Sequence, residues 1–336
     1  MTVAIRKVNQ DVAGAVAAVM EAADDRRFIP RSSTVFLKVN LGWDLFIPGS
    51  VTNPAVFEGV VKRLKGHAGR ICVVESGQVL EDVEKAYRKS RISEIAERNG
   101  VPWVNLSRCK KTIRTIPQNR AIKSVPVPVI FGEGILVTLP VMKTHNKTTV
   151  TLSLKNQWGC LPKLRHKYHR LLTEAIADVN AALGVKFGVM DGTIALEGNG
   201  PKTGRPREVG IVGAGADLVE LDSVFASLMG FNPREIPHLV EAERRGLGKI
   251  GSRFVGDDLD SSEPFKPAGH NLVSRIEMLL RESPISPLVF ETPLLWGMLA
   301  GAKTYYYLFD LMRGRAIREK FRRHPVYGRY FERSRR

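Results

Sequence analysis

Cysteine is scarce in this sequence, with three residues among 336. Cys72, Cys109 and Cys160 are widely spaced, odd in number and outside any Cys-x-x-Cys pattern. A disulfide framework is therefore not supported, and a reducing cytoplasm is the expected compartment. Three scattered thiolates also cannot supply the usual four-cysteine ligand set, so no iron–sulfur cluster is expected.

Long apolar runs, internal repeats and low-complexity blocks are also lacking. Glu291, Lys303 and Asp310 interrupt the apolar C-terminal part, which leaves no charge-free run of the about 18–20 residues that span a bilayer. Near the N-terminus, "VAGAVAAVM" faintly resembles a signal peptide, but Asp11 and Glu21 bracket it. We interpret this run as a helix of a cytoplasmic protein.

Acidic residues are absent from Gly134 to Thr173, in a chain whose net charge is +17. That segment holds "KTHNKTTVTLSLKNQWGCLPKLRHKYH". So much positive charge attracts a nucleic acid, an anionic membrane or an anionic metabolite. Nucleic acid is the least favoured of these, because no recognised nucleic-acid module is present and few aromatic residues are interleaved with the charges.

The order of apolar runs predicts an α/β fold with a mostly parallel, Rossmann-like sheet, flanking helices and a helical, basic C-terminal extension. In "TVFLKVNLG", Val35 and Leu37 alternate with Phe36 and Lys38, which is typical of a strand. A helix beginning at Asn53-Pro54 and the strand "RICVVESG" follow and complete a parallel crossover. We expect an α/β domain over residues 1–260 and a helical extension over residues 261–336.

Polar residues stand at the predicted strand ends, where ligands of such sheets bind. Lys38, Asn40 and Glu75 follow the first two strands. The strand "GILVTLPVM" should place Lys143 and His145 in the loop beyond it. A solvated Lys143 is expected, so Lys143→Ala should abolish ligand binding and shift the melting temperature only slightly. The alternative is that Lys143 and His145 are solvated surface residues without a functional role.

"TTVTLSLKNQWG" also alternates, so it is interpreted as a strand whose polar face carries hydroxyls and Lys155, with Asn156 after it. That face lines either a polar pocket or an exposed surface. His166 and His169 are three residues apart, as two metal ligands on a helix can be, but no motif supports a metal. His169 is favoured as a base or an anion ligand.

Further along, a helix is expected near Glu81 to Asn99, and edge strands or an inserted hairpin between Pro117 and Pro128. The strand "VKFGVMDG" should end at Asp191. After it, "DGTIALEGNGPKTGRP" is either a phosphate-binding loop with Gly198 and Gly200 or a long turn. Asp222 lies on the apolar stripe of a helix and needs a partner, which is a lysine, a buried backbone end or the ligand site. A structural ion pair is the favoured interpretation.

The motifs "VFLKVNL", "VVESG", "LPVMKTHNKTTVTLSLKNQWGCLP", "VMDG", "LEGNGPKTG", "GAGADLVELD" and "LMG" together resemble the domain of unknown function 362 family over about Thr34 to Gly248. The resemblance implies no defined activity. Some members carry a ferredoxin-like iron–sulfur module, from which this chain departs. The positions that match the polar parts of the family pattern are Lys38, Asn40, Glu75, Lys143, His145, Lys155, Asn156, His169, Asp191, Glu197 and Asp222.

The leading functional hypothesis is an enzyme that acts on an anionic small molecule in a cationic pocket. Lys143 or Lys155 would hold the anion, and His145 or His169 would move a proton. Glu75, Asp191 or Glu197 would orient these groups or bind a cation. The alternatives are a non-catalytic cofactor-binding or assembly protein that works with a redox partner, and a peripheral membrane or nucleic-acid-binding protein. The sequence does not indicate whether a cofactor is bound.

The C-terminal extension combines aromatic and basic residues, including Trp296, Tyr305 to Tyr307, and arginines from Arg313 onward. Such a segment either lies on an anionic membrane surface or packs against the main domain. The first alternative places the protein at the inner face of a membrane.

Overall fold

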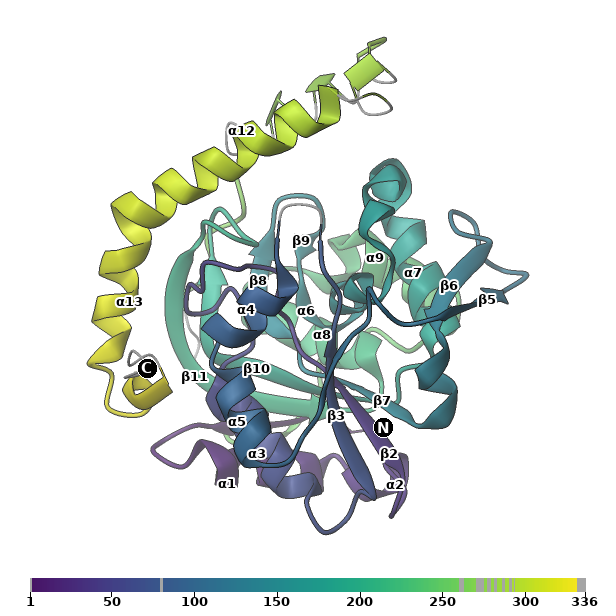
Figure 1. The fold of residues 1–336 in the computed structure, drawn as a ribbon. Helices are drawn as coiled ribbons and strands as arrows, with labels where there is room; N and C mark the ends of the chain where they lie inside the picture. The colour runs from purple at the N-terminus through teal and green to yellow at the C-terminus, as the bar shows by residue number, and fades with distance from the viewer. Residues whose placement is uncertain are drawn as a thin grey trace.

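A mixed sheet of ten strands forms the centre of the protein, with helices on both faces (Figure 1). The computed structural model describes residues 2–78, 81–259, 263–269, 275–276, 279–280, 283–285, 288–289, 292 and 294–330. The strands follow the order β12-β1-β11-β10-β7-β2-β3-β4, and β8 joins β10 to β9. Their bounds are β1 (Ala4–Lys7), β2 (Thr34–Lys38), β3 (Arg70–Glu75), β4 (Trp103–Asn105), β7 (Ile135–Thr138), β8 (Val141–His145), β9 (Thr149–Val150), β10 (Phe187–Glu197), β11 (Arg205–Gly215) and β12 (Val255–Gly256).

The run β10-β7-β2-β3-β4 is parallel throughout, whereas β11 pairs antiparallel with both β10 and β1. This arrangement confirms the predicted α/β class. Strand β2 explains why it forms: Val35 and Leu37 enter one hydrophobic core, while Phe36 enters the other. A strand buried on both faces needs apolar residues at consecutive positions, as parallel sheets do.

Two helical layers cover the sheet, each with its own core. The first core lies under α1 (Val12–Ala22), α3 (Pro54–Leu64) and α5 (Ile92–Arg98). The second core lies under α7 (Leu172–Leu183), α8 (Leu218–Leu228) and α9 (Pro237–Arg244). Helix α3 begins as predicted, because the Asn53 side chain accepts the N–H of Ala55 and Pro54 needs no partner. The shorter helices are α2 (Asp25–Phe28), α4 (Val83–Lys89) and α6 (Leu152–Asn156), with 3-10 turns at Val129–Glu133, Gln157–Cys160, Lys163–Leu171 and Pro233–Glu235.

A separate two-stranded hairpin stands beside this sheet. Strands β5 (Lys111–Thr115) and β6 (Ser124–Pro128) pair antiparallel and confirm the interpretation of the Pro-rich segment as an inserted hairpin. The helix expected near Glu81 to Asn99 is two helices, α4 and α5, because Arg91 adopts a left-handed conformation (φ 64°) that ends helical geometry.

The prediction of one strand for "GILVTLPVM" is wrong. Strand β7 ends at Thr138 and β8 begins at Val141, since Pro140 lacks an N–H and cannot continue the ladder. Strand β8 then pairs with a later part of β10, with Lys143 opposite Leu196. Lys143 and His145, which were expected in a loop, therefore lie on a strand of the sheet.

The prediction of a strand for "TTVTLSLKNQWG" is also wrong beyond Val150. Residues Leu152–Asn156 form helix α6, whose first amides are held by the carboxylate of Asp222 on α8. A distant side chain has decided the local structure here, as tertiary contacts often override a short β pattern. Lys155 is therefore presented by a helix.

The strand that was expected to end at Asp191 continues to Glu197 as β10. It pairs along its length with β11, through a register shift between Gly192 and Ile194. Ile194 and Leu196, which lie beyond the predicted end of the strand, are both buried in the core that contains α1 and α3. The loop predicted over Asp191–Pro206 is correspondingly short and begins at Gly198 (φ 74°).

The C-terminal extension is helical, as predicted: α12 (Leu294–Phe309), a π-helical turn (Asp310–Gly314) and α13 (Arg315–Arg322), followed by a 3-10 turn (Gly328–Tyr330). In Figure 1, α12 stands off the body and α13 descends along its side. Phe321, Tyr327 and Tyr330 are buried in the core that contains α1 and α3. Within the described residues, no helix is long and apolar enough to cross a bilayer. The division at residue 260 stays a prediction.

Candidate functional site

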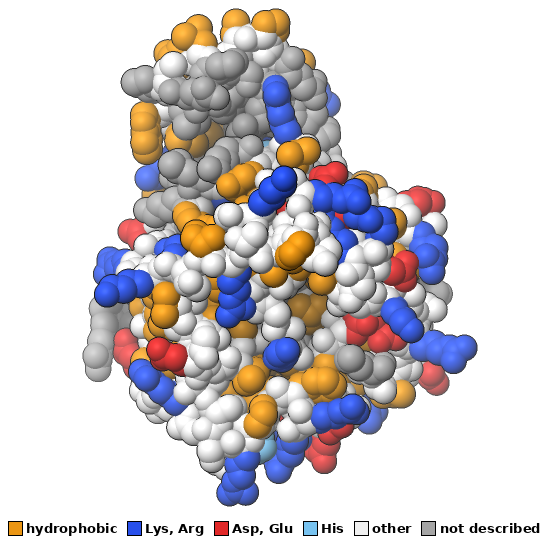
Figure 2. All heavy atoms as spheres, turned by 90° about the vertical axis from the view of Figure 1, so that its right-hand side faces the viewer, with side chains coloured by type: hydrophobic (Ala, Val, Ile, Leu, Met, Phe, Trp, Pro, Cys, Tyr) orange, Lys and Arg blue, Asp and Glu red, His pale blue; other side chains and the backbone are white. Residues whose placement is uncertain are grey.

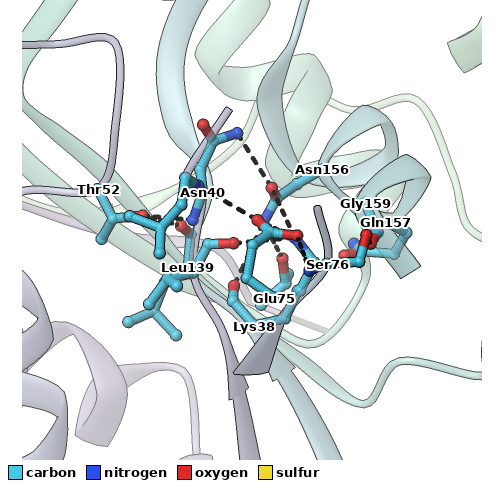
Figure 3. A network of polar contacts seen from close by, with 12 residues as sticks. Lys38, Asn40, Thr52, Glu75, Ser76, Leu139, Asn156, Gln157 and Gly159 are labelled. Atoms are coloured by element: carbon cyan, nitrogen blue, oxygen red, sulfur yellow. Dashed lines mark hydrogen bonds and ion pairs between the residues drawn. The ribbon is translucent and has the colours of Figure 1, made fainter. Parts of the chain in front are cut away.

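Polar side chains from four elements meet at the carboxyl ends of β2 and β3 (Figure 3). We call Lys38, Asn40, Glu75, Lys143 and Asn156 the buried network. The Lys38 ammonium donates to Glu75 Oε2 at 2.7 Å and to Asn156 Oδ1 at 3.4 Å. Asn40 Nδ2 donates to the same amide oxygen at 3.0 Å. The sequence prediction that these residues share one end of the sheet agrees with this geometry.

The Lys38–Glu75 ion pair is fully enclosed, with side-chain exposures of 0% and 6%. Glu75 also accepts the N–H groups of Ser76 at 2.8 Å and Leu41 at 3.2 Å. The backbone of Gly159 lies directly against the pair, and a Cβ there would lie 2.6 Å from Glu75 Oε1 and 2.7 Å from Lys38 Nζ. The glycine in "QWGC" is therefore required by close approach.

Lys143 links the network to the loop after β2. Its ammonium donates to Asn40 Oδ1 at 2.9 Å and to the Ser50 carbonyl at 2.6 Å. Only 2% of the residue is exposed, so the expectation of a solvated Lys143 is wrong. Removing its side chain would leave two buried acceptors without donors, so Lys143→Ala is now expected to lower stability as well. Burial lowers the pKa of Lys143 to about 7.

Helix α6 is positioned by Asp222, which is fully buried. Its two carboxylate oxygens accept the N–H groups of Ser153 at 2.7 Å and Leu154 at 2.8 Å. The partner of Asp222 is thus a buried backbone end, one of the alternatives raised by the sequence, and the favoured ion pair is wrong. Burial raises the pKa of Asp222 to about 7, against the lowering effect of these amides.

We expect Asp222→Ala to lower the free energy of unfolding by about 2 kcal/mol, because two buried amides lose their acceptor. Urea unfolding measures the change. The matched control is Asp258→Ala, which removes an exposed carboxylate and should change stability by less than about 0.5 kcal/mol. Equal stability of the two variants would contradict the capping role of Asp222.

A second group of side chains lies beside the buried network, and all of them except the buried Arg165 are partly exposed. We call His145, Lys147, Lys155, Arg165 and His169 the cationic rim. Lys147 Nζ lies 3.0 Å from His169 Nδ1, and the His169 ring stacks on Trp158. Lys155 Nζ lies 5.3 Å from the centre of the same indole. Trp158 therefore holds one lysine and one histidine of the rim together.

The rim groups repel one another strongly. The pKa of Lys155 is lowered to about 7, first by burial and then by the charges of Arg165, Lys147, Lys143 and Lys38. The pKa of His145 is lowered well below its usual range, first by burial and then by Lys155 and Lys147. Within the described part of the chain, the Lys155 ammonium has no hydrogen-bond acceptor. An anion would relieve this excess of positive charge.

The geometry fixes the tautomer of His145. Its Nδ1 accepts the N–H of Lys147 at 3.0 Å, and the depressed pKa keeps the ring neutral. The single ring proton is therefore on Nε2. A neutral imidazole with this tautomer donates a hydrogen bond to an oxygen of a ligand, and it does so without carrying charge.

The glycine-rich loop after β10 packs on β8. Thr144 Oγ1 donates to the Gly198 carbonyl at 3.0 Å, and Gly200 approaches the Thr144 carbonyl too closely for any side chain to fit. This packing directs Lys202 of the loop to Glu81, with which it forms an ion pair. Burial raises the pKa of Glu81 to about 7. Gly198 and Gly200 thus shape the loop through their backbones.

Asp191 and Glu197 are buried but bind protein groups of their own. Asp191 accepts the N–H of Asn53 at 2.7 Å and the hydroxyl of Thr193 at 2.6 Å, which secures the start of α3; burial raises its pKa to about 6. Glu197 pairs with Arg207 at 3.2 Å. The contacts of these two carboxylates lie outside the buried network.

A surface hollow of about 270 Å³ lies elsewhere, between α3, α5 and the C-terminal 3-10 turn. Its charges are largely paired: Arg98 binds Glu58 at 2.8 Å and Arg91 binds Glu94 at 2.6 Å. Because its cations already have carboxylate partners, we do not assign the chemistry to this hollow. The buried network and the cationic rim remain the better candidate.

Metal ligation finds little support in the geometry. Across the described ranges, no three His, Cys, Asp or Glu side chains converge on a point that could hold a metal ion. The side chain of His166, which was one half of the proposed His pair, lies outside the described residues. Cys72 and Cys160 are buried in the second core and Cys109 is partly buried, all as free thiols.

Sequence reasoning missed several members of the site. Lys147 and Arg165 lie in the acid-free segment and could have been found from that signal. Arg165 is buried and donates to Ser76 Oγ at 3.1 Å. No sequence pattern pointed to a role for Ser76. Glu81 has no sequence signal either, because only the fold brings it to Lys202.

Comparisons with known proteins match part of this chain. The profile of a family described as Domain of unknown function (DUF362) matches residues 35–227, more than half of the chain, and every predicted site residue lies inside these bounds. A thylakoid-associated protein of Synechocystis sp. is 34% identical over 129 residues, which are 36% of this chain and 40% of that protein. The chain therefore spans less than half the length of this relative.

Among solved structures, the lactate racemase apoprotein from Thermoanaerobacterium thermosaccharolyticum is similar with a TM-score of 0.37 and 12% sequence identity. The similarity covers 72% of this chain and 56% of that one.

Proposed function

This chain belongs to the DUF362 family, and we propose that it binds a small anionic molecule at the cationic rim and transfers a proton to or from it. The proposal rests mainly on the environment of Lys155. Its ammonium is partly buried among like charges and lacks an acceptor among the described residues. A partly buried cation among like charges is unfavourable, and a bound carboxylate or phosphate would offset that cost.

The geometry supports a division of labour within the site. Lys155, with a pKa of about 7, is near the midpoint of its titration at neutral pH, as an efficient proton-transfer group should be. Neutral His145 donates from Nε2 to an oxygen of the anion. Lys143, whose donors are directed at Asn40 and Ser50, is the positioning group that holds the loop after β2.

We further propose that the protein works in the cytoplasm, which is supported by its three free cysteines. Figure 2 shows lysine and arginine side chains spread over the whole of the face in view, without one continuous basic groove. This dispersion gives no support to a nucleic-acid interface on that face.

The test is anion binding by Lys155→Met. Inorganic phosphate and malate serve as probes, measured by calorimetry and by the shift in melting temperature at pH 6.5. We expect the variant to lose about ten- to a hundredfold in affinity, since a hydrogen bond between charged groups is removed. In the absence of anion, the variant should be at least as stable as the parent protein, because one of several like charges is gone.

Lys123→Met, which removes an exposed lysine next to β6, is the matched control and should bind both probes normally. Affinity that is unchanged in Lys155→Met would contradict the proposal. Proton transfer is tested separately by deuterium incorporation from D₂O into malate. Tight binding without exchange would favour the second candidate, a non-catalytic cofactor-binding or assembly protein.

A further inference from the structure

The outer face of the C-terminal helix carries large apolar side chains that no described element covers. Trp296, Leu308, Leu311 and Met312 are 65%, 52%, 55% and 78% exposed. In Figure 2, hydrophobic side chains also stand out on the upper lobe, at the height that α12 reaches in Figure 1. Four such residues along one stretch of helix are more than the scattered exposed apolar residues of an ordinary surface.

The opposite face of the same helix is fixed to the α/β domain. The Tyr306 ring meets Trp43 edge to face, with 4.9 Å between ring centres. Phe309 and Ile317 pack on the first core, and Arg318 donates to the Leu45 carbonyl at 2.9 Å. These contacts set the rotation of the helix about its axis, so its apolar outer face points away from the body.

Basic residues accompany the apolar ones. Lys303, Arg313 and Arg315 are exposed and have no acidic partner within the described ranges. Leu308, Leu311, Met312 and Arg315 have the i, i+3, i+4, i+7 spacing of one helix face, and Trp296 and Lys303 precede them where α12 stands off the body (Figure 1). Long basic side chains next to a tryptophan suit the boundary between lipid headgroups and acyl chains.

We propose that this outer face lies on an anionic lipid bilayer, with Trp296, Leu308, Leu311 and Met312 in the boundary layer and the three basic residues on the headgroups. A second copy of the chain is a poorer occupant. A symmetric pair of these faces would enclose Lys303, Arg313 and Arg315 from both copies, and these like charges disfavour such an interface.

The membrane contact would lie next to the candidate site without belonging to it. The ring of Tyr306 also faces Lys202, whose Nζ is 5.3 Å from its centre, and Lys85 Nζ donates to the Tyr307 hydroxyl at 2.8 Å. Lys202 in turn pairs with Glu81 beside the buried network. One helix thus touches both the bilayer and the border of the site.

Co-sedimentation of the full chain with vesicles tests the proposal. We expect binding to vesicles with about one-third phosphatidylglycerol at about 50 mM salt, weak binding to pure phosphatidylcholine, and release at high salt. Lys303→Gln, Arg313→Gln and Arg315→Gln together should weaken binding about a hundredfold, at about fivefold for each charge. Trp296→Ser with Met312→Ser should also weaken it, with an unchanged melting temperature.

The matched control removes the same net charge elsewhere, by Lys65→Gln, Lys110→Gln and Lys123→Gln at exposed positions of the α/β domain. It should bind vesicles within about twofold of the parent protein. An equal loss in this control would overturn the proposal, as would a full chain that ignores anionic vesicles at low salt. Dimerisation in solution that is lost in Trp296→Ser with Met312→Ser would assign the face to a second copy and likewise overturn it.

Discussion

Lys38→Met should lower the free energy of unfolding by about 3–5 kcal/mol, because it leaves Glu75 as a buried carboxylate without its cation. Glu75 would keep only the hydrogen bonds from the N–H groups of Ser76 and Leu41. Asn156 Oδ1 would also lose the hydrogen bond that the Lys38 ammonium donates. Methionine matches the length of lysine closely enough that the loss of packing is small. Urea unfolding at pH 7 measures the effect.

The double variant Lys38→Met, Glu75→Gln separates the orphaned charge from other causes. Removing the carboxylate charge should restore part of the stability, since no uncompensated ion remains in the core. Lys123→Met provides the surface control, with a change below about 0.5 kcal/mol. A double variant that is less stable than Lys38→Met alone would show that the energy lies in packing and not in the ion pair.

In the absence of ligand, the stability of the protein should rise between about pH 7.5 and 9, where ordinary proteins no longer gain stability. The pKa values of Lys143 and Lys155 are lowered from 10.5 to about 7 in the folded state. Over this range the unfolded chain binds more protons than the folded one, so the free energy of unfolding increases with pH. Each lysine contributes at most about 1.4 kcal/mol per pH unit.

Other shifted groups act mainly at or beyond the edges of this window. Glu81 and Asp222, with pKa values raised to about 7, oppose the rise at its lower edge, where they finish losing their protons. Asp191, with a pKa of about 6, and His145, with a strongly lowered pKa, complete their titration at lower pH. The pKa of the Cys160 thiol is raised to about 12 by burial, so this group opposes the rise from about pH 8.5 upward, where the thiol of the unfolded chain ionises. Urea unfolding of Lys155→Met should give about half the slope, while Lys123→Met should keep it. A flat profile in the parent protein would contradict the depressed pKa values.

Much of the candidate site was predictable because its residues are marked locally. Lys38 and Glu75 terminate strongly apolar strands, and parallel strands put their carboxyl ends at one edge of the sheet. The acid-free segment marked Lys143, His145 and Lys155, since charge composition is visible without any fold. Lys147 and Arg165 lie in the same acid-free segment, so they too could have been predicted from it.

The partners of these residues were not predictable, because each is distant along the chain. Asp222 lies 69 residues from Ser153, yet it turns an alternating segment into helix α6 and so decides where Lys155 points. Asn40 and Lys143 are 103 residues apart. Nothing in the local sequence distinguishes a solvated lysine from one that is enclosed by a loop and a strand.

The sequence by itself determined the α/β class, the start of α3, the inserted hairpin and the helical, basic nature of the C-terminal extension. These follow from periodicity, capping residues and proline, whose effects act over a few neighbouring residues. Only the tertiary structure decided that Lys143 is buried, that Lys155 lacks an acceptor among the described residues, and that Tyr306 faces inward while Trp296 faces outward. Burial and electrostatic environment depend on which distant elements pack together, so no local pattern could contain them.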